Sequence, residues 1–254
     1  MNRILFEQCE VRDGLATFSD VRAEHVLGVL HGEVGKTLKT GIIDGPVGTS
    51  VIERIEGNSV TVRCTHDAQS LPPWIDLVLA PPRPRVMKRL LPQLASLGVR
   101  RVFLVGAEKV EKAFWGAQLL KEEIYRPLLV DGLQQAGTTQ VPTIHVAKNF
   151  VRFLKLQLDS TFDGQDVRIV AHPYAVEGRP ADEKAPWPGL SQGRIPVLAV
   201  GPEGGWTEGE VALLEERGFV RMSLGARILR TDTALVALLG ILMRAHGEAL
   251  RVQN

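Results

Sequence analysis

The hydrophobic pattern of this chain changes at Leu71-Pro72-Pro73, and this change constrains the fold more than any other feature. Before the prolines, short runs rich in Val, Ile and Thr alternate with Gly-containing turns, which is typical of β-strands joined by hairpins. One helix is expected at residues 21–30, with Asp20 as its N-cap. We therefore predict a small β-barrel or sandwich domain over residues 1–72. Its clearest strands are residues 36–43, 47–55 and 59–64.

Beyond the prolines, continuous apolar runs alternate with helical segments. This alternation predicts an α/β domain over residues 73–254, with a parallel sheet covered by helices on both faces. Residues 174–194 are rich in Pro, Gly and charged residues, and predict a long surface loop. The expected strands are residues 75–80, 102–105, 143–146, 167–171, 197–200 and 219–224, and the expected helices are residues 83–97, 110–115, 121–135, 208–217 and 233–246.

The composition argues against several classes of protein. Ile4-Leu5-Phe6 is followed at once by Glu7, unlike a signal peptide. The longest apolar run, residues 234–243, is about half of what a bilayer requires, so we expect no membrane span. The two cysteines lie far apart, which favours a reduced, cytoplasmic location. The six histidines show no metal-ligand spacing, and we expect no metal.

The charge distribution differs between the two parts of the chain. Residues 1–72 hold seven Lys and Arg against ten Asp and Glu, whereas residues 83–126 hold ten against four. A basic segment of this kind is either a solvated helix face or a surface that binds a phosphate backbone. In the second interpretation, the RNA-binding residues are Arg83, Arg85, Lys88 and Arg89.

Two Gly-rich turns near the C-terminus carry most of the functional information. The first spans residues 200–206, Val-Gly-Pro-Glu-Gly-Gly-Trp, and leads into a T-x-x-E capping box at Thr207 and Glu210. Gly201, Gly204 and Gly205 permit positive φ and close approach of a ligand to the backbone, so a β-branched residue at Gly204 is expected to abolish binding. The glycine spacing fits neither a P-loop nor a dinucleotide fingerprint. The alternative is a tight strand-to-helix turn without a ligand.

The second turn spans residues 224–234 and places Arg230 at a helix N-terminus. A cation at a helix N-terminus interacts unfavourably with the helix dipole, and residues that are locally unfavourable in this way concentrate at functional sites. The alternative is a solvent-facing arginine beside capping hydroxyls. In the first turn, Glu203 either stabilises the turn or faces a ligand.

Together, the two turns resemble the C-terminal motifs of the SPOUT methyltransferases. The closest resemblance is to the RsmE family, which methylates N3 of a uridine in small-subunit ribosomal RNA. The order of Leu79-Ala80-x-Pro82-Arg83-Pro84 and Leu97-Gly98-Val99 also resembles this family, although Gly28, His31, Ser96 and Gly137 depart from its usual residues. The resemblance implies a trefoil-knotted domain after a PUA-like, RNA-binding β-barrel, and a homodimer. Residues 234–243 are apolar nearly all round, so that helix must be buried or paired.

The resemblance also implies that S-adenosylmethionine binds between three loops. The target would be a uridine of 16S ribosomal RNA, free or in the small ribosomal subunit. Arg230 would stabilise the negative charge on the uridine, and Glu203 would accept its proton or orient a group. The alternatives are another base or ribose RNA methyltransferase of the superfamily, and a non-catalytic RNA-binding assembly factor. The implied cofactor-binding residues are Ala171, His172, Pro173, Val200, Gly201, Pro202, Glu203, Gly204, Gly205, Leu224, Gly225, Ile228, Leu229 and Thr233.

Overall fold

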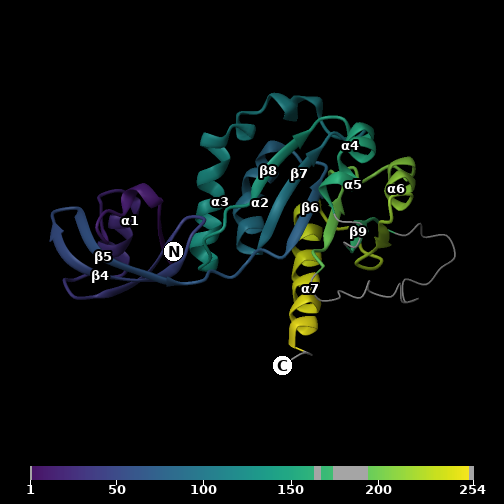
Figure 1. Cartoon of the computed structure of the whole chain (residues 1–254). Coiled ribbons are helices and arrows are strands. Elements are labelled where there is room, and N and C mark those ends of the chain that lie inside the picture. Colours follow the sequence, from purple (N-terminus) through teal and green to yellow (C-terminus); the bar gives the residue numbers. More distant parts are fainter. Residues whose placement is uncertain (1, 163–166, 174–193, 252–254) are drawn as a thin grey trace. The chain divides into compact units, whose positions relative to one another are not determined.

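The computed structural model describes residues 2–162, 167–173 and 194–251 (Figure 1). The chain forms two compact units. The N-terminal unit comprises residues 1–73 and 126–141, and the C-terminal unit comprises residues 74–125 and 142–254. The segment 126–141 therefore packs with the β-rich part of the chain, although it follows the first strands and helix of the other unit in sequence.

A five-stranded sheet forms the N-terminal unit, in the order β1-β3-β4-β5-β2. The hairpins expected from the turn residues are confirmed, because β3 pairs antiparallel with β4 and β4 with β5. The short strands β1 and β2 were not expected, and β1 runs parallel to β3. The core between these strands includes Phe6, Phe18 and Ile52. The strands are β1 Ile4–Phe6, β2 Leu15–Phe18, β3 Thr37–Ile42, β4 Val47–Glu56 and β5 Ser59–Ala68.

The helix expected at residues 21–30 is present in two parts. Helix α1, Val21–Glu24, begins after Asp20, whose carboxylate accepts a hydrogen bond from the Arg22 backbone N–H at 2.9 Å. The cap is therefore confirmed. The chain then continues as a π-helical turn, η2 His25–Val29, which the 3.6-residue periodicity does not predict. The unit also contains the 3-10 turn η1, Gln8–Glu10.

The C-terminal unit contains a six-stranded, entirely parallel sheet in the order β11-β9-β10-β6-β7-β8. Every residue of β6 and β10 is buried, so both faces of the sheet centre are covered, as the apolar runs predict. Figure 1 shows β6, β7 and β8 side by side. The strands are β6 Ile75–Leu79, β7 Val99–Val105, β8 Thr143–Ala147, β9 Arg168–Ala171, β10 Val197–Val200 and β11 Val220–Met222.

Four of the five helices predicted over residues 73–254 are present with shifts at their ends, and α4 and α5 were not expected. Near residues 110–115 the chain forms a 3-10 turn rather than an α-helix. No helix in the described part of the chain is long and apolar enough to cross a membrane. The predicted loop at residues 174–194 lies outside the described residues, except for Arg194. The helices are α2 Pro84–Ser96, η3 Lys112–Gly116, η4 Gln118–Leu120, α3 Glu122–Ala136, α4 Phe150–Leu156, α5 Leu158–Thr161, α6 Glu208–Glu215 and α7 Thr231–Arg251.

A buried ion cluster lies on the central strands of this sheet. Asp76 of β6 is 0% exposed. Its carboxylate accepts hydrogen bonds from Arg100, at 2.9 and 2.5 Å, and from Arg101, at 3.1 and 2.5 Å. Burial raises the pKa of Asp76, but the hydrogen bonds from the two arginines outweigh that effect and hold this pKa below its usual value. Both arginines belong to the basic segment, and both form ion pairs with Asp76 inside the protein.

Candidate functional site

The three loops expected to bind the cofactor follow three neighbouring strands. Strand β9 lies between β11 and β10, and all three run parallel, so their carboxyl ends meet at one edge of the sheet. Beyond these ends lie residues 171–173, 200–205 and 224–229. The His172 backbone N–H donates to the Met222 carbonyl at 3.0 Å, which joins the first loop to the third. In parallel α/β sheets, this edge is where ligands bind.

The β10–α6 loop requires glycine for two different reasons. Gly205 has φ of +67°, a left-handed conformation that favours glycine. At Gly201, an added Cβ would lie 2.8 Å from the Trp206 backbone nitrogen and 3.0 Å from the Gly205 carbonyl carbon. The expectation of positive φ is wrong for Gly201 and Gly204, which are absent from the positive-φ glycines among the described residues. Gly201 is required by close backbone packing instead.

The same loop is fixed from several sides. The capping box is confirmed: Thr207 Oγ1 accepts from the Glu210 N–H, and Glu210 Oε2 accepts from the Thr207 N–H at 2.9 Å. The other oxygen of Glu210 accepts from the Glu108 backbone N–H at 2.8 Å. Lys109 Nζ donates to the Gly204 carbonyl, also at 2.8 Å. These contacts hold the turn rigidly against the segment that follows β7.

Glu203 has a structural contact of its own. Its side chain is exposed, and one carboxylate oxygen accepts a hydrogen bond from the Arg83 backbone N–H at 2.9 Å. Arg83 is the N-cap residue of α2, so the carboxylate lies at the positive end of that helix. The sequence left open whether Glu203 stabilises a turn or faces a ligand. The structure shows that it joins the β10–α6 loop to the start of α2.

The loop after β11 presents exposed side chains. Gly225 has φ of +105°, and Leu224 is half-buried. Ile228 is 93% exposed, which is unusual for a large apolar side chain. Arg230 is exposed at the N-terminus of α7, where its carbonyl accepts from the Ala234 N–H at 2.8 Å. Thr233 is exposed as well, and its N–H donates to Asp232 Oδ1 at 3.0 Å.

Within the described residues, two buried nitrogens of the first two loops have no hydrogen-bond partner, namely Nδ1 of His172 and Nε1 of Trp206. The other ring nitrogen of His172 lies 3.0 Å from Glu208 Oε1. Hydrogen bonds from His172, and then from Arg221, lower the pKa of Glu208. Trp206 stacks on Phe150, with ring centroids 5.2 Å apart. Unpartnered buried polar atoms need an explanation, and a bound ligand supplies one.

The residues of this edge fit a ligand that packs against bare backbone and carries polar groups. Gly205 and Gly225, where an added Cβ would meet no atom within 4 Å, leave the backbone bare, and two buried nitrogens are available for hydrogen bonds. Sequence reasoning missed Glu208 and the orphaned indole N–H of Trp206, because the contacts of both depend on the fold. Among the described residues, no group of three or more His, Cys, Asp or Glu side chains could hold a metal.

The four candidate RNA-binding residues divide into two pairs. Arg83 is bonded to Glu111 at 2.8 Å and Arg89 to Asp232 at 3.1 Å, so their charges are partly neutralised. Arg85 and Lys88 are exposed on α2, and neither makes an ion pair within the part of the chain that the structure describes. The basic surface is therefore smaller than the segment 83–126 indicates.

Helix α7 has one buried and one exposed face. Leu235, Leu238, Leu239 and Leu242 are buried within the chain. Val236, Ile241 and Met243 are 36%, 39% and 44% exposed. The sequence predicted that residues 234–243 are either buried or paired, and burial holds for one face only. The other apolar face is not covered by any residue in the described part of the chain.

The comparison with known proteins assigns this chain to a family. Residues 69–243 match the family model described as RNA methyltransferase domain. The ribosomal RNA small subunit methyltransferase E of Treponema pallidum is 32% identical over 97% of this chain and 92% of that protein. The chain belongs to the RsmE family of RNA methyltransferases. Ribosomal RNA small subunit methyltransferase E 1 of Borreliella burgdorferi is 26% identical, over 93% of this chain and 95% of that protein.

Solved structures share the fold of this RsmE-family chain. A probable rRNA-methyltransferase from Porphyromonas gingivalis aligns with a TM-score of 0.72 and 24% identity, over 96% of this chain and 98% of that one. The ribosomal RNA small subunit methyltransferase E of Neisseria gonorrhoeae, solved bound to S-adenosyl methionine, gives a TM-score of 0.68 and 21% identity, over 96% and 97%. The α/β fold with its parallel sheet is therefore that of known methyltransferases.

Proposed function

We propose that this protein transfers a methyl group from S-adenosylmethionine to N3 of a uridine in 16S ribosomal RNA. The observation that carries the proposal is the match to a ribosomal RNA small subunit methyltransferase E along nearly the whole chain. The gathering of both Gly-rich loops and His172 at one sheet edge supports it independently. The substrate is free ribosomal RNA or the small ribosomal subunit, and the protein acts in the cytoplasm.

The cofactor would lie at the carboxyl ends of β9, β10 and β11. S-adenosylmethionine supplies an electrophilic methyl group on a positively charged sulfur. Gly205 and Gly225 would let it approach the backbone, Gly201 lets the loop close on itself, and His172 Nδ1 and Trp206 Nε1 offer hydrogen bonds to its polar groups. The proposed cofactor residues are Ala171, His172, Pro173, Val200, Gly201, Pro202, Glu203, Gly204, Gly205, Leu224, Gly225, Ile228, Leu229 and Thr233.

Arg230 is the proposed catalytic residue. Loss of the N3 proton places negative charge on the uridine oxygens, and an exposed guanidinium at the start of α7 can stabilise that charge. Among the described residues, no carboxylate is paired with Arg230 to compete for it. Glu203 is assigned a positioning role, because its carboxylate already accepts the Arg83 N–H. The remainder of the reaction is alignment of N3 with the methyl carbon.

Replacement of Arg230 tests this role. Arg230→Ala should lower the single-turnover rate at saturating RNA by about 10²-fold or more, the usual effect of losing one charge-stabilising group, and leave cofactor affinity nearly intact. Arg227→Ala is the matched control, because Arg227 is an exposed arginine of the same loop. If Arg230→Ala weakened RNA binding and left that rate unchanged, the assignment would be wrong.

Several features of the family are part of the same proposal. The C-terminal unit would be a trefoil-knotted SPOUT domain over residues 73–254, and residues 1–72 a PUA-like domain that binds RNA. Two copies would form a homodimer through the exposed face of α7, where Val236, Ile241 and Met243 lie. Arg85 and Lys88, with Arg83 and Arg89, would contact RNA phosphates without reading sequence.

Nucleoside mass spectrometry of 16S ribosomal RNA tests the proposal directly. Cells that lack this protein should lose one 3-methyluridine, and purified protein with S-adenosylmethionine should restore it on small subunits from those cells. A methyl group that remains on the sugar after removal of the base would identify a ribose methyltransferase instead. Unchanged methylation in the deletion strain, together with no transfer in vitro, would refute the proposal.

A further inference from the structure

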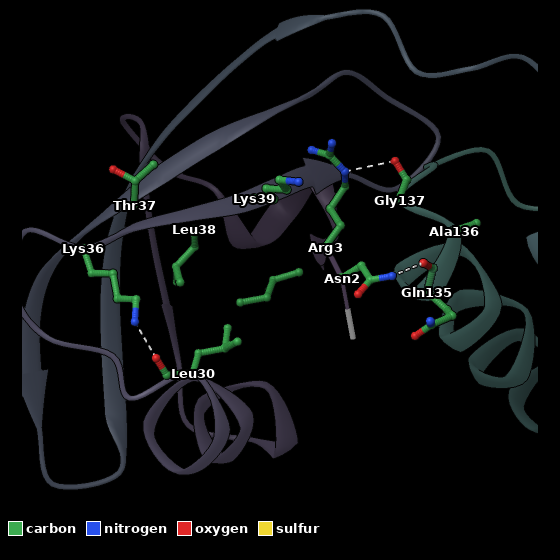
Figure 2. A pocket seen from close by; sticks show the side chains of 11 residues that line it. Asn2, Arg3, Leu30, Lys36, Thr37, Leu38, Lys39, Gln135, Ala136 and Gly137 are labelled. Atoms are coloured by element: carbon green, nitrogen blue, oxygen red, sulfur yellow. Dashed lines mark hydrogen bonds between the residues drawn. The ribbon is translucent and has the colours of Figure 1, made fainter.

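A pocket lies within the N-terminal unit, far in sequence from the Gly-rich loops. Figure 2 shows its walls, which come from the start of β1, the start of β3, the end of α3 and Leu30. Its volume is about 570 Å³, within the range of pockets that bind small ligands. It is lined by Asn2, Arg3, Ile4, Leu30, Lys36, Thr37, Leu38, Lys39, Gln135, Ala136 and Gly137.

The charge of this pocket differs from that of the unit around it. The residues of the N-terminal unit include eight Lys and Arg against eleven Asp and Glu. Three of the eight cations, Arg3, Lys36 and Lys39, line the pocket, and none of the eleven carboxylates does. Three cations of an otherwise acidic unit therefore line one cavity, as a binding site for an anion requires.

The polar contacts of Arg3 and Lys36 leave their charges uncompensated. Arg3 donates through Nε to the Gly137 carbonyl at 3.0 Å and through Nη1 to the carbonyls of Thr40 and Gly48, at 2.6 and 3.0 Å. Lys36 Nζ donates to the Leu30 carbonyl. Carbonyl oxygens are neutral, so these bonds fix the cations in place without cancelling them. Figure 2 shows the Lys36 and Arg3 contacts on different walls.

Lys39 completes the cationic part of the lining. Its side chain is exposed, and within the described ranges it makes no hydrogen bond or ion pair. The other part of the lining is apolar: Ile4 and Leu38 are buried, and Leu30 is half-buried. Thr37, Asn2 and Gln135 add hydrogen-bonding groups to the lining. A cationic edge beside an apolar surface suits a ligand that carries both a phosphate and a flat organic ring.

We propose that this pocket binds one nucleotide of a single-stranded RNA segment. The phosphate would lie against Lys39 and Arg3, with the sugar and base over Ile4, Leu30 and Leu38. The lining contains no aromatic residue on which a base could stack, so the contact should depend little on base identity. The inference rests on the proposed RNA substrate and gives the N-terminal unit a defined contact with it.

Charge reversal at Lys39 tests the pocket in the full-length protein. Binding of a fluorescein-labelled single-stranded RNA is measured by anisotropy over a series of salt concentrations. Lys39→Glu should weaken binding by about tenfold or more and lower the log–log salt slope by about one. The matched control is Arg12→Glu, which reverses an exposed cation of the same unit that lies outside the pocket. Its effect should be less than about threefold, since it touches no phosphate.

A second variant and a second ligand sharpen the test. Thr37→Trp adds bulk to the pocket wall without changing the charge, and should also weaken RNA binding. Calorimetry with S-adenosylmethionine should give the wild-type affinity for both variants, which shows that the C-terminal unit is intact.

Binding of uridine 5′-monophosphate shows whether the pocket takes a nucleotide within RNA or a free nucleotide. Tight, Lys39-dependent binding of the monophosphate, with RNA binding unaffected by Lys39→Glu, would overturn the proposal.

The outcomes separate this inference from the proposed function. If Lys39→Glu and Arg12→Glu bind RNA equally well while the wild type methylates small subunits, the pocket assignment is wrong and the methyltransferase assignment stands. If the wild type neither methylates ribosomal RNA nor binds RNA, the proposed function fails, and this inference fails with it.

Discussion

The close packing inside the β10–α6 loop leads to a sharp prediction about cofactor binding. A Cβ added at Gly201 would lie 2.8 Å from the Trp206 nitrogen, 3.0 Å from the Gly205 carbonyl carbon and 3.2 Å from Gly205 Cα. All three atoms belong to the backbone of the same loop, so no side chain can rotate away and the loop itself must open. Gly201→Ala should therefore deform the surface on which we place the cofactor.

The magnitude follows from the cost of overpacking. Inserting one carbon into a well-packed site costs about 1–3 kcal/mol. If the loop relaxes in the free protein, this strain must be restored on binding, which weakens affinity for S-adenosylmethionine by about 5- to 150-fold. At Gly204, by contrast, an added Cβ would meet Lys109 Cδ at 2.9 Å, which is the flexible end of a side chain. Gly204→Ala should cost less than about fivefold, because Lys109 can move.

Titration calorimetry in EDTA measures both variants, with thermal unfolding as the control for folding. Gly205→Ala is a third variant for comparison. At a φ of +67°, a residue with a side chain has a conformational energy about 1–2 kcal/mol higher than glycine. Gly201→Ala and Gly205→Ala should therefore bind more weakly than Gly204→Ala. Equal affinities for the variants at Gly201 and Gly204, or weaker binding at Gly204, would refute the packing argument.

Three further predictions follow from the ion cluster, the basic surface and the last helix. Asp76→Asn should lower the free energy of unfolding in urea by about 3 kcal/mol, because it removes the carboxylate charge that two partly buried arginines share. The pKa of Asp76 is lower in the folded state than in the unfolded state. The stability that its charge contributes is therefore fully present above about pH 4, the unfolded pKa, and is lost as the pH falls through the folded pKa. A difference in unfolding free energy between variant and wild type that did not change with pH would contradict this. Arg85→Ala with Lys88→Ala should lower the salt slope of RNA binding by about one to two units in a salt titration, whereas an unchanged slope would remove these residues from the interface. Ile241→Asp should convert the dimer to a folded monomer, as measured by light scattering. Leu238→Asp should instead unfold the chain, because Leu238 is only 1% exposed. A wild-type protein that is monomeric would refute the dimer proposal.

The sequence by itself determined the features that depend on local backbone chemistry. The apolar runs at β6 and β10 predicted buried parallel strands, since a strand covered on both faces has no polar positions. Asp20 and the Thr207–Glu210 capping box marked the starts of two helices, because a cap satisfies N–H groups only two or three residues away. The order of these elements placed the Gly-rich loops at strand ends.

Only the tertiary structure decided which groups meet across long separations in the chain. Glu203 accepts a hydrogen bond from the N–H of Arg83, 120 residues earlier, and Asp76 pairs with Arg100 and Arg101, two arginines of the basic segment 83–126. Gly201, rather than Gly204, proved the tightly packed glycine, because its neighbours are set by how the whole loop closes. Residues 126–141 join the N-terminal unit although their helix begins in the other. Periodicity shows which face of a segment is buried, but the surface that buries it is set by the complete fold.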